Sequence, residues 1–145
     1  MEKINFVNNS EPYLSAENLN QLQTNIENAI NGFVLYENES GTTENITLNE
    51  TSSNYNAIEI MYGCDGYYFS TGKIFSPNGK KIGLQTPSVS ETVDERIFIY
   101  TSNWQINEGN INFIKASNKY MNPDNSIASF GTTSYIRIFK VIGYK

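Results

Sequence analysis

The sequence contains no histidine and a single cysteine, Cys64, among its 145 residues. A lone cysteine cannot form a disulfide within the chain, and zinc sites built on histidines or on several cysteines are excluded. Nucleophile–histidine dyads and triads are excluded as well, because the general base is missing.

Charged residues and long apolar runs are also scarce. Only 17% of residues are charged, and the net charge of -5 leaves no basic excess of the kind that nucleic-acid binding requires. No apolar run approaches the roughly 20 residues that span a bilayer. The first nine residues, "MEKINFVNN", lack the apolar segment of a signal peptide. We therefore expect no nucleic-acid partner, no membrane span and no secretion.

Aromatic residues and asparagine are abundant instead, with ten Tyr and eight Phe. After Gly32 the pattern is one of short β-type segments separated by turn residues, with "SPNGKK" (76–81) the strongest hairpin signal and 37–44 a loop. This pattern predicts a mainly β fold, a single antiparallel β-sandwich or jelly roll over 33–145. The predicted strands are 33–36, 45–48, 56–62, 66–76, 81–86, 95–102, 111–117 and 134–145.

Several predicted strands carry apolar residues on both faces, most clearly 96–100 and 135–144. One explanation is a strand in the middle of a thick core. The other is a second face that another subunit covers. The strands alone do not distinguish the two.

The N-terminal part, residues 1–32, has a different organisation. Residues 1–14 read as an extended arm, since Pro12 stands where a helix cannot yet have begun. Ser15 is a good N-cap and Gly32 a natural end, so the spacing predicts a helix over 16–31. At 1.5 Å per residue this helix is about 24 Å long.

The predicted helix has a narrow apolar stripe whose members are spaced by three and four residues, as in a coiled coil. It could dock on the edge of its own β-domain, although such helices usually have a wider apolar face. We favour a short parallel bundle with copies of the same chain. Two heptads are marginal alone, so the β-domains would have to associate too. The stripe comprises Leu19, Leu22, Ile26, Ala29 and Phe33, with Ile30 beside it.

The segment "INFVNNSEPYLSAENLNQLQTNIENAI" (4–30) resembles the N-terminal segment of tail-fibre, baseplate-appendage and head-fibre proteins of phages and prophages of Firmicutes. The matching residues are Ile4, Phe6, Asn8, Pro12, Leu14, Ala16, Asn18, Leu19, Asn20, Gln23 and Ile26. The remainder is similar, more loosely, to a small β-domain of such structural proteins.

This resemblance implies a non-enzymatic virion protein, a homotrimer anchored to other virion proteins through 1–14, with an outward β-domain that contacts host-surface carbohydrate. The chain has neither the shaft nor the larger head of many receptor-binding proteins, so a head fibre or capsid decoration protein is the alternative. A stand-alone carbohydrate-binding module is a further one. A glycan hydrolase is disfavoured, because no convincing pair of carboxylates is present.

The candidate ligand-binding residues combine aromatic faces with an acid, as sugar sites do. They are Asp65, Tyr67, Tyr68 and Trp104. The alternative is that these aromatic side chains fill the sandwich core or a subunit interface. Glu37, Glu39 and Glu44 surround a loop and read as solvated. Calcium at "NPDNS" (122–126) is conceivable but poor in acids, and we expect no cofactor and no metal.

Overall fold

The computed structural model describes residues 16–64, 68–89 and 96–145, and the chain divides into two compact units between Phe33 and Val34. The first unit contains α1 (Ala16–Asn31), which begins and ends where the capping residues predict. Gly32 follows it with a φ of 71°, and its N–H donates to the carbonyl of Asn28 at 2.9 Å. Glycine adopts this left-handed conformation at no steric cost, so the helix ends here.

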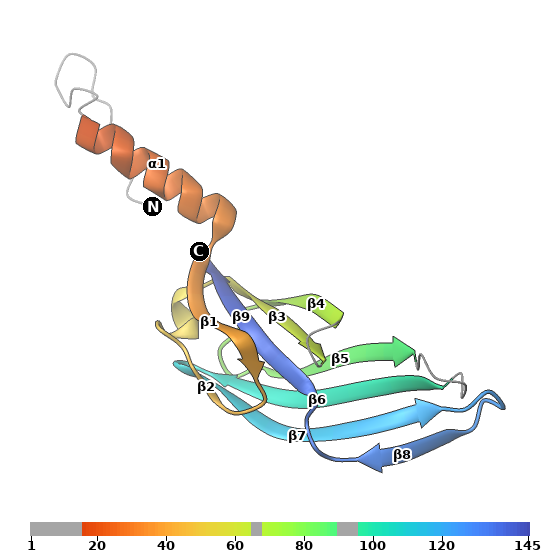
Figure 1. Cartoon of the computed structure of the whole chain (residues 1–145). Coiled ribbons are helices and arrows are strands. Elements are labelled where there is room, and N and C mark those ends of the chain that lie inside the picture. The colour runs from red at the N-terminus through yellow and green to blue at the C-terminus, as the bar shows by residue number, and fades with distance from the viewer. Residues whose placement is uncertain (1–15, 65–67, 90–95) are drawn as a thin grey trace. The chain divides into compact units, whose positions relative to one another are not determined.

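The second unit is built of two antiparallel sheets, which confirms the mainly β, sandwich-like prediction (Figure 1). The first sheet has the strand order β1-β9-β3-β4, and the second has the order β2-β7-β6-β5 with β8 paired to β7. The first sheet comprises β1 (Phe33–Thr42), β3 (Ala57–Cys64), β4 (Tyr68–Phe75) and β9 (Ile136–Tyr144). The second comprises β2 (Ile46–Thr47), β5 (Lys81–Val89), β6 (Ile97–Asn107), β7 (Asn110–Met121) and β8 (Ile127–Gly131).

The predicted loop at 37–44 contains strand, and β8 lies outside all of the predicted strands. Residues 37–42 continue β1, although the sequence there is polar and was expected to be a loop. β1 lies at the edge of its sheet, beside β9. Edge strands tolerate exposed charged residues, and here Glu37 of β1 pairs with Lys140 of β9, with 2.8 Å between Oε1 and Nζ. β8 was missed because its five residues, "IASFG", lie in a segment rich in turn residues.

The "SPNGKK" segment is not a hairpin turn, contrary to the prediction. β4 and β5 on either side of it belong to different sheets, so the segment turns a corner between the two layers. Gly79 has a φ of 76° and donates its N–H to the Ile106 carbonyl at 2.8 Å. The true two-residue hairpin is Glu108-Gly109, between β6 and β7, where Asn107 pairs with Asn110.

The core lies between the inner faces of the two sheets, where β5 contacts β3, β4 and β9, and β6 contacts β9. Alternate residues on each strand point into it, as the pleat of a strand dictates. The first sheet contributes Leu35, Ile58, Ile60, Ile136, Ile138 and Val141, and the second contributes Ile46, Leu84, Trp104, Ile106, Ile111 and Ala116.

One edge of the core is closed by Tyr55, whose ring lies against the backbone of Gly143 in β9. A Cβ added at Gly143 would lie 2.5–2.8 Å from three ring atoms of Tyr55, closer than any real contact. The Tyr55 hydroxyl donates to Glu50 Oε2 at 2.7 Å. Burial raises the pKa of this phenol, and the hydrogen bond to the Glu50 carboxylate raises it further. The absence of a side chain at Gly143 therefore lets a large aromatic ring cover the end of β9.

Replacing Gly143 by alanine should lower the free energy of unfolding by about 1–3 kcal/mol, because the ring of Tyr55 would have to move. Urea denaturation of the purified variant would measure this. Gly109→Ala is the matched control, since nothing lies within 4 Å of the added Cβ there. Equal stability of both variants would show that the Tyr55–Gly143 contact is not needed.

Candidate binding sites of the β-domain

Of the four ligand-binding residues predicted from the sequence, only Trp104 has a described side chain. Asp65 and Tyr67 lie outside the described residues. Tyr68 begins β4 and pairs with Cys64, but its side chain is not among those described. Only Trp104 can be placed in full.

The prediction that Trp104 contacts a ligand is wrong, because the side chain is completely buried. Its indole Nε1 donates to Ser102 Oγ at 2.7 Å, and its ring meets Phe113 edge-on with 5.2 Å between centroids. An indole whose polar atom is paired and whose faces are covered belongs to the core. The alternative stated above, that this aromatic residue fills the sandwich, therefore holds for Trp104.

The structure instead brings five aromatic rings together at the end of the second sheet where β6 begins and β7 ends. Sequence reasoning did not identify this aromatic cluster. Neighbouring ring centroids lie 5.3–6.4 Å apart. Phe130 touches each of the other four rings, and Arg96 lies over one face of the Tyr120 ring, 4.9 Å from its centroid. The cluster comprises Phe98 and Tyr100 on β6, Tyr120 on β7, Phe130 on β8 and Tyr135 just before β9.

The aromatic cluster is partly open to solvent and has polar groups beside it. Phe130 and Tyr135 are 37% and 38% exposed. In the register of the sheet, Tyr100 lies between Thr86 and Asn118. Both are buried, and Thr86 Oγ1 and Asn118 Oδ1 have no hydrogen-bond partner in the described part of the chain. Rings with polar atoms beside them suit a ligand that has both apolar faces and hydroxyl groups.

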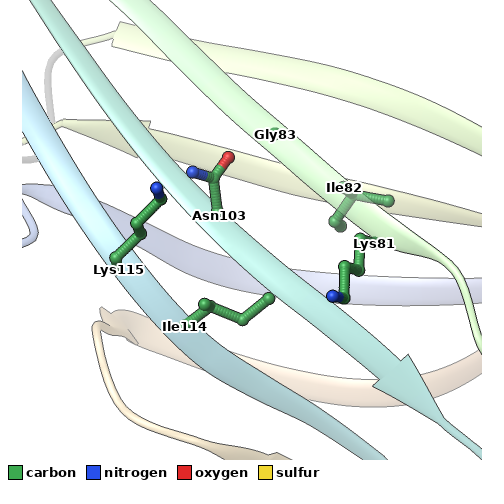
Figure 2. Close-up of a pocket in the computed structure, with 6 residues that line it drawn as sticks. All are labelled: Lys81, Ile82, Gly83, Asn103, Ile114 and Lys115. Carbon is green, nitrogen blue, oxygen red and sulfur yellow. The ribbon is translucent and has the colours of Figure 1, made fainter.

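A second candidate site is a cleft of about 420 Å³ on β5, β6 and β7 (Figure 2). Lys115 and Asn103 are paired residues of β7 and β6, and Gly83 is the partner of Asn103 on β5. A Cβ at Gly83 would lie 3.3 Å from Asn103 Oδ1, so the missing side chain keeps this part of the cleft open. The cleft is lined by Lys81, Ile82, Gly83, Asn103, Ile114 and Lys115.

A β-bulge shapes the same cleft. The register of β6 and β7 shifts between Asn103 and Trp104, so that Ile114 is an extra residue on β7. A bulge re-aims the side chains next to it, which brings Ile114 to the surface beside Lys115. Sequence reasoning missed the cleft because its residues come from three strands, and the sequence does not show how those strands pair.

A further cavity of about 300 Å³ lies beside the corner between β4 and β5. Apart from Tyr55, the side chains that line it carry no titratable group, and the Tyr55 hydroxyl is already bonded to Glu50. None of the side chains that line this cavity is an acid or a base that would activate its serine hydroxyls. It is lined by Ser53, Tyr55, Asn56, Ser76, Pro77 and Asn78.

At 122–126, the segment with a possible calcium ligand, Asp124 accepts hydrogen bonds from the hydroxyl and the backbone N–H of Ser126, at 2.6 and 2.9 Å. These bonds lower the pKa of the Asp124 carboxyl, and they satisfy it within its own turn. Across residues 16–64, 68–89 and 96–145, no three acids or cysteines gather where they could hold a metal ion. Within the same ranges, no helix is long and apolar enough to cross a bilayer.

Comparison of the chain with protein-family models, curated proteins and solved structures finds no match in any of the three. Function must therefore be argued from the chemistry of the chain itself.

Replacing Trp104 by alanine should lower the free energy of unfolding by about 3–5 kcal/mol, as for other buried aromatic residues. In the wild type the emission of this single tryptophan should be blue-shifted and poorly quenched by acrylamide, because water does not reach the ring. Emission typical of a hydrated indole in the folded protein would contradict the buried position.

Proposed function

We propose that the chain is a non-enzymatic virion structural protein, a homotrimeric phage fibre or tail appendage that attaches through residues 1–14 and presents its β-domain to the host surface. A head fibre or capsid decoration protein is the variant of this proposal that shares the same architecture. The observation that carries it is the apolar stripe of α1.

The large aliphatic side chains of the apolar stripe on α1 are exposed to solvent in the single chain. Leu19, Leu22 and Ile26 are 47%, 44% and 50% exposed, and Ile30 is 71% exposed. The side chain of Ala29 is not described, and Phe33 is half-buried where β1 begins. Four large aliphatic side chains repeating along one helix face favour a partner that covers them.

The flanks of α1 are suited to packing against identical copies. With Leu19 and Ile26 as a positions of the heptad, the neighbouring e and g positions carry no charge. Glu17 and Glu27 fall on the opposite side, so a parallel bundle brings no like charges together. Hydrogen bonds one turn apart, from Gln21 to Asn25 at 3.2 Å and from Gln23 to Glu27 at 2.8 Å, support the helix on its polar side.

A bundle of more than two helices fits the width of the stripe. Ile30 at an e position broadens the apolar face beyond the a and d positions of a two-stranded coil. A helix of 16 residues is marginal alone, so the bundle needs help from the β-domains. The half-buried outer-face residue Ile142 on β9 is a candidate for that contact.

Attachment to a virion rests on the resemblance of residues 4–30 to the N-terminal segments of phage appendage proteins. Residues 1–14 lie outside the described residues, so their part in attachment stays a prediction. The polar, capped helix that follows them is consistent with an arm that binds elsewhere while the helix assembles.

Recognition of surface carbohydrate is assigned to the aromatic cluster in place of Trp104. Phe130 and Tyr135 offer accessible rings, and sugars stack on such rings through their C–H faces. One shallow site binds weakly, but three copies on a trimer would raise the apparent affinity through effective concentration. The same cluster is what favours the second candidate function, a monomeric carbohydrate-binding module.

Leu22→Asp with Ile26→Asp should dissociate the assembly, because each copy would place two charges inside the bundle. Light scattering should give three times the 16.4 kDa chain mass for the wild type and one chain mass for the variant. Asn20→Asp with Thr24→Asp adds the same charge on the exposed opposite side and should stay trimeric. A monomeric wild type at micromolar concentration would support the module instead of the fibre.

Phe130→Ala with Tyr135→Ala should weaken binding to host cell-wall glycans by about tenfold, from the loss of two ring contacts. A glycan array followed by calorimetry on the best ligand would measure this. Phe75→Ala is the control, since Phe75 is 70% exposed and outside the cluster. Glycan binding that survives in the double variant would remove the aromatic cluster as the site.

A further inference from the structure

Charge is distributed unevenly between the two sheets, although the whole chain has a net charge of -5. The strands of the first sheet carry acids and bases together, such as Glu37 and Lys140, which pair with each other. The five strands of the second sheet contain no aspartate and no glutamate. Their only charged residues are Lys81, Lys115 and Lys119.

The basic side chains of the described residues fall into two groups by what they contact. Those in the first group are engaged by carboxylate, carbonyl or aromatic partners: Lys73, Arg96, Arg137, Lys140 and Lys145. The second group, Lys80, Lys81, Lys115 and Lys119, makes no ion pair, side-chain hydrogen bond or ring contact with any described residue. Two members of this second group, Lys81 and Lys115, line the cleft of Figure 2.

The cleft places these two ammonium groups where one ligand can meet both. Lys115 on β7 is the partner of Asn103 on β6, and Lys81 on β5 is the partner of Gln105, so the two lysines lie diagonally across β6. Neighbouring strands are about 4.8 Å apart, so the two outer strands are separated by about 10 Å. In Figure 2 the two lysine side chains extend toward β6 from opposite sides. An anion above Asn103 would lie within reach of both lysines and of the amide.

We infer that this cleft is a binding site for an anionic group, a phosphate or a carboxylate, carried on a sugar or another polyol. The two lysines supply the charge, and the Asn103 amide can both donate and accept hydrogen bonds with hydroxyl groups. Exposed Ile114 offers apolar contact to the C–H groups of such a ligand. Because Gly83 has no side chain, the cleft is deep enough beside Asn103 to admit a ligand.

A nucleic acid fits the cleft less well, although it also carries phosphates. The lining contains no aromatic side chain on which a base could stack and no arginine. Three lysines on one sheet are few against the backbone contacts that such binding requires, and the acidic remainder of the chain repels a long polyanion. A volume of about 420 Å³ suits a ligand of one or two sugar rings.

The site is distinct from the aromatic cluster, because the two lie on opposite faces of the same sheet. Along β6, Tyr100 points to the same inward face as buried Ser102, whereas Asn103 points outward. All six residues that line the cleft belong to the same sheet, so a single β-domain can form the site.

The test is a titration of the full-length protein with glycerol 3-phosphate and with glucuronate, followed by NMR shifts of backbone amides, with glycerol and glucose as the uncharged counterparts. Both acids, or one of them, should shift the amides of Gly83, Asn103 and Lys115, while the uncharged counterparts should not at equal concentration. The arm that binds tells phosphate from carboxylate. Raising the salt concentration should weaken binding, because the lysines are exposed.

Lys81→Ala and Lys115→Ala should each raise the dissociation constant about fivefold, the effect of one exposed ion pair. Gly83→Val should abolish binding by filling the cleft with no change in charge. Lys80→Ala is the matched control: it removes the same charge one residue away, from a side chain that does not line the cleft, and should bind as the wild type does. Circular dichroism of each variant would confirm the fold.

Three outcomes would overturn the inference. The first is that neither acid shifts the NMR signals of the cleft amides, even when the acid is present at 20 times the protein concentration or more. The second is wild-type affinity in the Lys81→Ala/Lys115→Ala double variant. The third is tighter binding of a single-stranded oligonucleotide than of the sugar acids, with the same lysine dependence.

Discussion

The burial of Trp104 between the two sheets is the contact on which the rest of the β-domain depends. Its ring fills the space between β6 and the opposite sheet, and the Ser102 hydroxyl accepts its only polar hydrogen. A buried indole of this kind removes about 200 Å² from water, worth about 5 kcal/mol as an upper bound. Register follows from it: once Trp104 points inward, every second residue of β6 does too, so that Asn103 faces outward and Tyr100 inward.

That alternation decides which surfaces are left for binding. On the inner face, the apolar residues around Trp104 give way to Tyr100, Thr86 and Asn118 farther along the sheet, where the aromatic rings reach solvent. On the other face, the same strands present Asn103 and unpaired lysines. One sheet thus has an aromatic surface and a cationic surface, separated by the thickness of the strand layer. A ligand that contains both sugar rings and acidic groups could meet either.

Assembly and recognition make different demands on this chain. In the proposed assembly the stripe of α1, which carries no charge at its flanks, packs against like copies. The proposed anion site instead depends on the positive charge of a cleft that one chain forms. The two can therefore be altered separately by substitution. If three chains associate through α1, three clefts and three aromatic clusters act together, and weak single sites become useful through effective concentration.

The sequence by itself determined the helix and its ends, the mainly β character and most strand positions, because capping residues, periodicity and turn residues act over a few neighbours. It also showed which side of α1 is apolar. It could not place Trp104, since an aromatic residue near a turn is compatible with both a core and a ligand site. Nor could it show that "SPNGKK" joins two sheets, that 37–42 pairs as an edge strand, or that Phe98, Tyr100, Tyr120, Phe130 and Tyr135 meet. Those features arise from pairing between strands far apart in sequence, together with the bulge at Ile114, and only the tertiary structure fixes that pairing.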